Sequence, residues 1–189
     1  MSSYTALFDA SVLYPATIRD ILMQLAVTDL FRAKWTADIH EEWIRSLLKD
    51  RPQFKRADLE RTRTLMDTAV RDCLVAGYQQ LIPSLTLPDP DDCHVLAAAI
   101  AGRCDVIVTQ NLKDFPEAVL ASYGINAQHP DEFLSNHLNL APGVFCDAIR
   151  KVRARLKNPP FTAPQYLDVL TQNGLVATAS ELVQFSTLI

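Results

Sequence analysis

Apolar residues in the first 130 positions form short continuous runs that alternate with helical stripes. The runs predict four buried strands, at residues 4–8, 30–35, 105–109 and 125–128. Between them, apolar positions three and four apart predict four helices: one with Pro15 in its first turn, one after Thr36, one from about residue 56 and one after Asp92. A shorter helix is expected between Pro116 and Gly124. The alternation favours an α/β domain built around a parallel sheet.

Finer details of these elements also follow from local residue chemistry. Thr36 is the expected N-cap of the second helix. The third helix is expected over residues 56–74, with inward-facing apolar side chains at Leu59, Leu65, Met66 and Val70. Residues 81–87 predict an extended connection. Asp92 is an obvious N-cap for the helix that follows it, with Asp89 and Asp91 as competitors.

From Pro130 onward the pattern is helical only. The predicted helices cover residues 131–138, 141–156, 164–173 and 177–185. We therefore expect a three-layer α/β domain with a central parallel sheet over residues 1–138, followed by a helical C-terminal extension over residues 139–189.

Composition narrows the class of protein. With 189 residues, 49% hydrophobic and 21% charged, the chain is globular rather than disordered. A net charge of -4 means that any contact with nucleic acid must depend on local basic patches. The four cysteines form no CxxC pair, which argues against zinc. No signal peptide or membrane span is evident, so we expect a cytoplasmic protein with no membrane association.

Carboxylates gather at the predicted strand ends. Asp9 follows the first strand, Asp114 follows the strand ending at Thr109, Asp92 begins the helix before that strand, and Glu42 lies on the second helix. Ligands of open parallel sheets bind at this edge. Clustered carboxylates recruit a hard cation such as Mg²⁺ or Mn²⁺, which activates water and clamps a phosphodiester.

Each acid also has a purely structural interpretation. Asp9 could end a strand, Glu42 could be a solvated surface charge, Asp92 could cap its helix, and Asp114 could stabilise a turn. Their order and local contexts make the functional interpretation stronger than any one residue does.

Those contexts resemble a known family. The segments FDASVLYP, TADIHEEW, DPDDCHVLAAAIAG and DVIVTQNLKDFP are similar to the four signature segments of PIN domains, over roughly residues 4–135. The similarity is closest to the VapC-like toxins of bacterial toxin–antitoxin systems. The C-terminal helices are similar to extensions found on some of these proteins.

The resemblance implies roles for single residues. Asp9, Glu42, Asp92 and Asp114 match the four acidic positions, with Asp9, Asp92 and Asp114 as metal ligands. Glu41 competes with Glu42, and Asp91 with Asp92. Many relatives have an aspartate where this chain has Asn111, so the resemblance implies Asp114 as the fourth acid and Asn111 as an assisting ligand, with the closer of the two left open. Thr109 is expected to help orient the site.

The resemblance also implies an activity and partners: an endoribonuclease that uses Mg²⁺ or Mn²⁺, cleaves RNA, forms a homodimer and is blocked by an antitoxin protein. Independently, basic residues crowd one predicted helix at Arg150, Lys151 and Arg153. They are either a phosphate-binding patch or the solvated face of an amphipathic helix.

Three other classes of protein fit the sequence less well. A phosphatase of the haloacid-dehalogenase type needs a second aspartate two residues after the first, where this chain has Ser11. A receiver domain needs paired acids at the first strand's end. A catalytically inactive PIN scaffold that binds RNA or a protein is disfavoured because all four acidic positions are filled.

Overall fold

Four short strands form one parallel sheet in the computed structural model, which describes residues 4–189. The spatial order is β2-β1-β3-β4. The strands are β1 (Thr5–Phe8), β2 (Arg32–Lys34), β3 (Val106–Val108) and β4 (Asn126–Gln128). Every residue of the two central strands, β1 and β3, is buried. The four predicted strands and their parallel arrangement are therefore confirmed.

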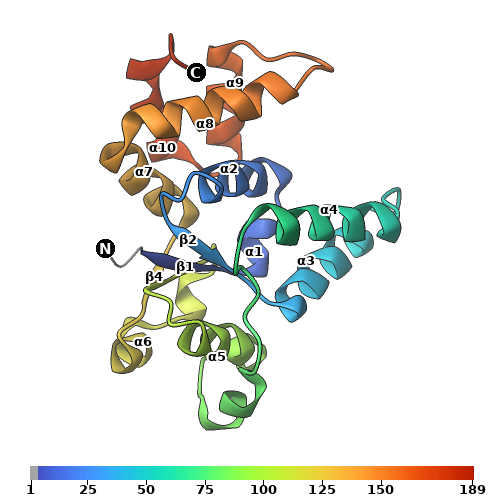
Figure 1. Ribbon diagram of the computed structural model, residues 1–189, viewed down its shortest axis with the longest axis vertical. Coiled ribbons are helices and arrows are strands. Elements are labelled where there is room, and N and C mark those ends of the chain that lie inside the picture. The colour runs from blue at the N-terminus through green and yellow to red at the C-terminus, as the bar shows by residue number, and fades with distance from the viewer. Residues whose placement is uncertain (1–3) are drawn as a thin grey trace. The chain divides into compact units, whose positions relative to one another are not determined.

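Helices connect the strands, as parallel pairing requires. One helix between β1 and β4 belongs to the second unit and is described below. The others are α1 (Ala10–Leu13), α3 (Ala37–Asp50), α4 (Arg56–Ala69), α5 (Cys93–Ala101) and α6 (Glu117–Leu120). Helix α5 contacts β1 and β3, while α6 contacts β4, and both lie on one side of the sheet in Figure 1. Helices α3 and α4 pack side by side. Thr36 caps α3 as predicted, because its hydroxyl accepts the Ile39 N–H at 3.0 Å.

The chain divides into two compact units. The first runs to Tyr14 and resumes over Phe31–His129, so it holds the whole sheet. The second comprises Pro15–Leu30 and Pro130–Ile189. It contains α2 (Ala16–Ala26), α7 (Pro130–Leu140), α8 (Pro142–Arg155), α9 (Ala163–Gln172) and α10 (Val176–Leu182).

Within the second unit α2 packs against α8, and α10 packs against α7 and α9. The predicted α/β class with a helical C-terminal region is confirmed. The domain division between residues 138 and 139 stays a prediction. Over residues 4–189, none of the helices is both long and apolar enough to cross a bilayer.

Three local predictions were wrong. Helix α4 ends at Ala69 rather than near residue 74, and Leu65 is 61% exposed although it was expected to face inward. Met66 is the buried neighbour, and a step of one residue turns a helix by about 100°. The stretch expected to be extended contains the 3-10 helix Gln79–Ser84, closed by short-range bonds such as Leu81 N–H to the Tyr78 carbonyl.

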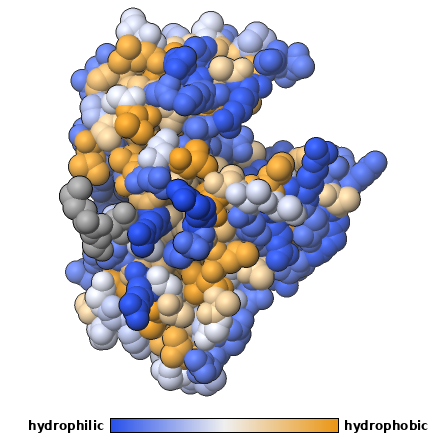
Figure 2. Space-filling view, in the orientation of Figure 1, coloured by the Kyte–Doolittle hydropathy of each residue, from blue (hydrophilic) through white to orange (hydrophobic). Residues whose placement is uncertain are grey.

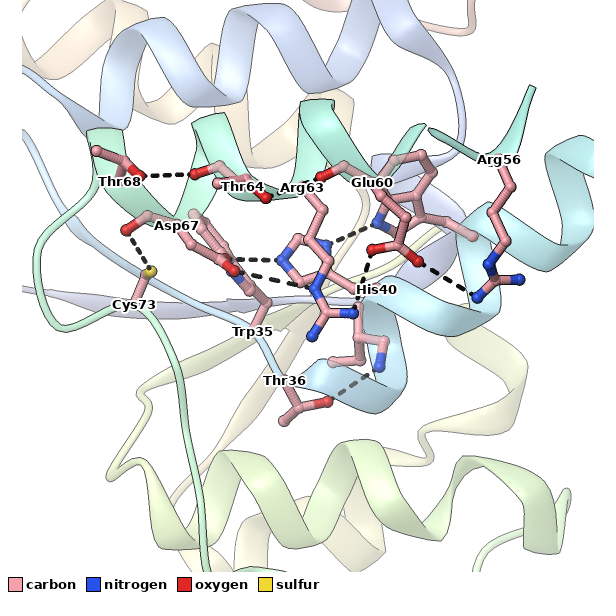
Figure 3. Close-up of polar contacts among 12 residues, drawn as sticks. Trp35, Thr36, His40, Arg56, Glu60, Arg63, Thr64, Asp67, Thr68 and Cys73 are labelled. Atoms are coloured by element: carbon pink, nitrogen blue, oxygen red, sulfur yellow. Dashed lines mark hydrogen bonds and ion pairs between the residues drawn. The ribbon is translucent and has the colours of Figure 1, made fainter. Parts of the chain in front are cut away.

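A buried polar network joins α3 to α4 and to the end of β2 (Figure 3). The side chains of Trp35 and His40 are fully buried, and both reach the same oxygen of Asp67 on α4. The Trp35 indole N–H donates to Asp67 Oδ1 at 2.8 Å, and His40 Nε2 lies 2.9 Å from that oxygen. Trp43 donates its indole N–H to His40 Nδ1 at 3.0 Å.

These contacts settle the state of the His40 ring. An indole nitrogen only donates, so His40 Nδ1 must accept and the ring proton sits on Nε2, facing Asp67. Burial lowers the pKa of His40 and keeps the ring neutral, although Asp67 opposes this shift. The network fixes the rotation of α3 about its axis. The outer surface of the α3–α4 pair, in contrast, is largely hydrophilic (Figure 2).

We expect Asp67→Ala to lower the free energy of unfolding by about 2–3 kcal/mol, because two buried donors lose their acceptor while some water can still reach them. Asp67→Asn keeps an acceptor oxygen and should cost less than about 1 kcal/mol. Chemical denaturation measures both. Equal losses for the two variants would contradict the assigned role of Oδ1.

Candidate functional site

A pocket of about 310 Å³ lies where β1 ends and α1 begins. Three of the four predicted acids line it, and so does the predicted assisting residue Asn111. The lining residues are Asp9, Ala10, Ser11, Tyr14, Glu42, Trp43, Ser46, Asp92 and Asn111. Asp114, in the 3-10 helix Leu112–Asp114, does not line the pocket, but its charge acts on Asp92. Segments distant in sequence thus converge at one place.

Asp9 is the most deeply placed acid. It is only 4% exposed, and its backbone N–H donates to the Val108 carbonyl of the neighbouring strand at 3.1 Å. Its side chain does not cap α1, although the residue occupies the N-cap position. Burial raises the pKa of Asp9, and the negative charge of Glu42 adds to this, while nearby hydroxyls oppose it. The Asp9 side chain therefore does not serve as the cap of α1.

Two hydroxyl groups hold the Asp9 carboxylate. Ser11 Oγ donates to Asp9 Oδ2 at 2.7 Å, and Thr109 Oγ1 donates to the same oxygen at 2.8 Å. Each hydroxyl in turn accepts a backbone N–H, from Gln110 at 3.1 Å and from Asn111 at 3.0 Å. Because those amides occupy the hydroxyl oxygens, the hydroxyl protons are directed at Asp9. These contacts hold the loop after β3 against Asp9. Thr109, which was expected to help orient the site, contacts Asp9 directly.

The Asp92 side chain does not cap a helix, although the sequence made it an obvious N-cap. The side chain of Asp89 accepts the Asp91 N–H at 2.9 Å and so caps the 3-10 helix Pro90–Asp92. Asp92 itself makes no side-chain cap to α5. Burial raises the pKa of Asp92 to about 7, helped by the charges of Asp9, Asp89, Asp114 and Glu42 in that order.

The structure separates Glu42 from Glu41. Glu42 lines the pocket, and its Oε2 lies 3.4 Å from Nε2 of His94 on α5. Glu41 does not line the pocket, and it pairs with the exposed Arg56 at the start of α4. One step around α3 therefore moves a carboxylate from the pocket to the surface.

The donor chemistry of the pocket fits a hard divalent cation. Its charged donors are carboxylates, with the Asn111 side chain beside them, and oxygen ligands of this kind select Mg²⁺ or Mn²⁺. Burial, with the charges of neighbouring carboxylates added to it, raises the pKa values of Asp9 and Asp92, and a bound cation would favour their ionised forms. Within residues 4–189, no three His, Cys, Asp or Glu side chains stand close enough together to form a ready-made metal site.

The predicted basic patch lies in the second unit, on α8, and its members have partners there. Arg150 and Lys151 are exposed and both form ion pairs with Asp147, the Lys151 pair at 2.7 Å. Arg153 donates to the carbonyl oxygens of Phe161 at 2.6 Å and Ile189 at 3.1 Å. Arg153 thus holds backbone in place, whereas the other two have surface contacts that solvent screens.

The sequence analysis did not predict several residues that line the pocket or contact a residue of its lining. Ser11 was noted only as the absence of a second aspartate, yet its hydroxyl holds Asp9. Tyr14 and Ser46 line the pocket, and His94 contacts Glu42. Spacing offered a partial signal, because Ser11 and His94 each follow a predicted acid by two residues.

Comparison with known proteins identifies two matching family models. The model described as "PIN domain" matches residues 5–113, and the one described as "VapC50 C-terminal domain" matches residues 130–184. The first covers the four acidic positions except Asp114, and the second covers most of the C-terminal helices.

A curated relative matches part of the chain. "Putative ribonuclease VapC50" of Mycobacterium tuberculosis is 43% identical over 94 residues, which cover 50% of this chain and 55% of that relative. The match thus spans little more than half of the relative's length. No solved structure matches the chain.

The raised pKa of Asp92 predicts a pH-dependent stability. The unfolded chain releases this proton near the ordinary value of 3.8, but the folded protein releases it near 7. In the absence of divalent ions, the group therefore costs nothing below about pH 4, lowers stability as pH rises between these values, and has its full cost above pH 7.

We expect Asp92→Asn to stabilise the metal-free protein at pH 8 and not at pH 4. One pKa unit corresponds to about 1.4 kcal/mol, and solvent screens this half-buried group, so the expected gain is about 1–2 kcal/mol. Chemical denaturation at both pH values measures it, with the exposed Asp91→Asn as the matched control. The same gain at both pH values would show that the effect is not electrostatic.

Proposed function

Because this chain belongs to the PIN domain family, we propose that it is a metal-dependent endoribonuclease that acts as the toxin of a toxin–antitoxin pair. One observation carries the proposal: Asp9, Glu42 and Asp92, from three separate segments, border one pocket at the end of β1. The relative named as a ribonuclease supports the choice of RNA as substrate.

We propose that Asp9, Asp92 and Asp114 hold a divalent cation, Mg²⁺ or Mn²⁺, with Asn111 as an assisting ligand. When bound, such an ion lowers the pKa of water and neutralises charge on a phosphodiester. Asp9 suits the central position because Ser11 and Thr109 fix its carboxylate through one oxygen. Charge repulsion couples Asp114 to Asp92, while Asn111 borders the pocket directly.

The protein groups divide the remaining work. Glu42 borders the pocket and is proposed to accept a proton from the attacking water. Ser11 and Thr109 keep Asp9 from rotating, so that it meets its ligand without reorganisation. The pocket holds no candidate serine–histidine or cysteine–histidine pair among its lining residues, in keeping with a mechanism that uses water.

Contacts with substrate and with protein partners are also proposed. Arg150 and Lys151 are exposed cations that a phosphate backbone could recruit from Asp147. Such phosphate contacts give affinity without sequence choice. An antitoxin that covers the acidic pocket, and a homodimer, are proposed because the C-terminal region matches the VapC50 C-terminal model and a relative bears the same name.

We expect purified protein to cleave single-stranded RNA with Mg²⁺ or Mn²⁺ and to lose cleavage in EDTA. Asp9→Asn and Asp92→Asn should each reduce the rate by at least about 100-fold, because each removes a charged ligand, and Glu42→Gln by a similar factor through the lost proton acceptor. Glu41→Gln, its neighbour on α3, is the matched control and should leave the rate unchanged. Gel-based cleavage kinetics measure all four.

Two results would contradict the proposal. Cleavage that is equally fast in EDTA would remove the metal from the mechanism. RNA binding without cleavage under any divalent ion would favour an inactive PIN scaffold instead.

A further inference from the structure

His94 touches the proposed proton acceptor from outside the pocket. It lies in the first turn of α5, two residues after Asp92, and its Nε2 is 3.4 Å from Glu42 Oε2. In the described part of the chain, no other side chain forms an ion pair or hydrogen bond with the Glu42 carboxylate. The contact links the helix that follows one acid to the helix that carries another.

His94 has the position of a residue that supports Glu42, not of one that contacts substrate. Glu42 lines the pocket, but His94 is not among the lining residues, and its side chain is only 19% exposed. The ring therefore contacts a residue of the pocket lining without bordering the pocket itself. Any influence on bound substrate has to pass through Glu42.

A second observation separates His94 from an ordinary packed histidine. Its Nδ1 is buried and has no hydrogen-bond partner in the described structure. Buried ring nitrogens without partners cost free energy, and the rare cases in native proteins call for an explanation. By contrast, both ring nitrogens of His40 have partners. The arrangement of His94 serves the Nε2 contact at the expense of Nδ1.

Glu42 needs such a contact because like charges oppose its place at the pocket. Its charge raises the pKa values of both Asp9 and Asp92, so these carboxylates repel it in turn. The His40–Asp67 network fixes the helix but not the flexible Glu42 side chain, which is 36% exposed. Without a partner, the carboxylate is free to rotate outward into water.

We propose that His94 is a positioning residue that holds the Glu42 carboxylate at the pocket against the repulsion of Asp9 and Asp92. In this role the Nε2 side of the His94 ring faces Glu42 Oε2, 3.4 Å away. The catalytic consequence of this contact rests on the proposed nuclease function, whereas the position of Glu42 does not.

The kinetic test compares His94→Ala with wild type on an RNA substrate. We expect kcat to fall about 10–100-fold, the usual scale for losing a supporting contact, with KM changed by less than about 3-fold. Because His94 acts through Glu42, the double variant His94→Ala/Glu42→Gln should be no slower than Glu42→Gln alone. Additive losses, or an unchanged kcat for His94→Ala, would overturn the proposal.

Two conservative variants provide a matched pair. Glutamine can place an amide nitrogen near the position of Nε2, so His94→Gln should recover kcat to within about 3-fold of wild type. Asparagine is one methylene shorter and cannot reach Glu42, so His94→Asn should stay as slow as alanine. If His94→Ala does not fold, this pair alone decides, and equal rates for Asn and Gln would contradict the role of the contact.

A readout without RNA or metal keeps the two proposals distinguishable. The orientation of the Glu42 side chain, determined by crystallography of wild type and His94→Asn, should change from facing the pocket to facing solvent. If wild type fails to cleave RNA, the proposed function fails, yet this structural comparison still decides the positioning role. An unchanged Glu42 orientation would overturn it.

Discussion

Carboxylates held together at one edge of the sheet, at a cost in the free energy of ionisation, are the feature around which the rest of the structure is arranged. Asp9 is almost fully buried and Asp92 is partly buried, and burial is the largest cause of their raised pKa values. The charge of Glu42 raises both pKa values further, and the charge of Asp9 raises that of Asp92. Folding alone gives no reason to gather like charges in this way, and perturbed carboxylates in a pocket are typical of functional sites. The surrounding contacts make sense as devices that keep these acids in place.

Those devices act at different levels. Paired hydroxyls from Ser11 and Thr109 fix the first acid directly, and backbone amides of the following loop orient the hydroxyls. The Asp89 side chain caps the 3-10 helix Pro90–Asp92, and the Asp92 side chain, at the N-cap position of α5, makes no cap hydrogen bond. The neutral His40 ring contacts Asp67 and sets the rotation of α3, and this rotation decides which way Glu42 faces.

Much of this architecture could be predicted from the sequence, because strand runs and helical stripes reflect burial alone. The central strands and the C-terminal helices followed from such patterns, and the Thr36 cap followed from the capping preference of threonine. Leu65 was misplaced because neighbouring apolar residues compete for one helical face, and only packing decides between them. The 3-10 helix Gln79–Ser84 was missed because short i to i+3 turns leave no periodic signal.

The candidate site shows the same limit. Acid positions were legible as residue types in sequence contexts, and the structure brings three of the four to one pocket. The contacts of Ser11 with Asp9 and of His94 with Glu42 could not be predicted from the sequence, because only the folded backbone brings these side chains together. Choosing between Asp89 and Asp92 as the helix cap likewise required the geometry of the turn.

We propose that this cluster of acids is held together to bind a divalent cation. Calorimetric titration of the metal-free protein with Mn²⁺ is the decisive test, because it needs neither RNA nor cleavage. Binding to wild type and to the exposed-site variant Asp91→Asn, with loss in Asp9→Asn and in Asp92→Asn, is the predicted result. Undiminished binding to Asp9→Asn, or no binding to wild type, would contradict the account.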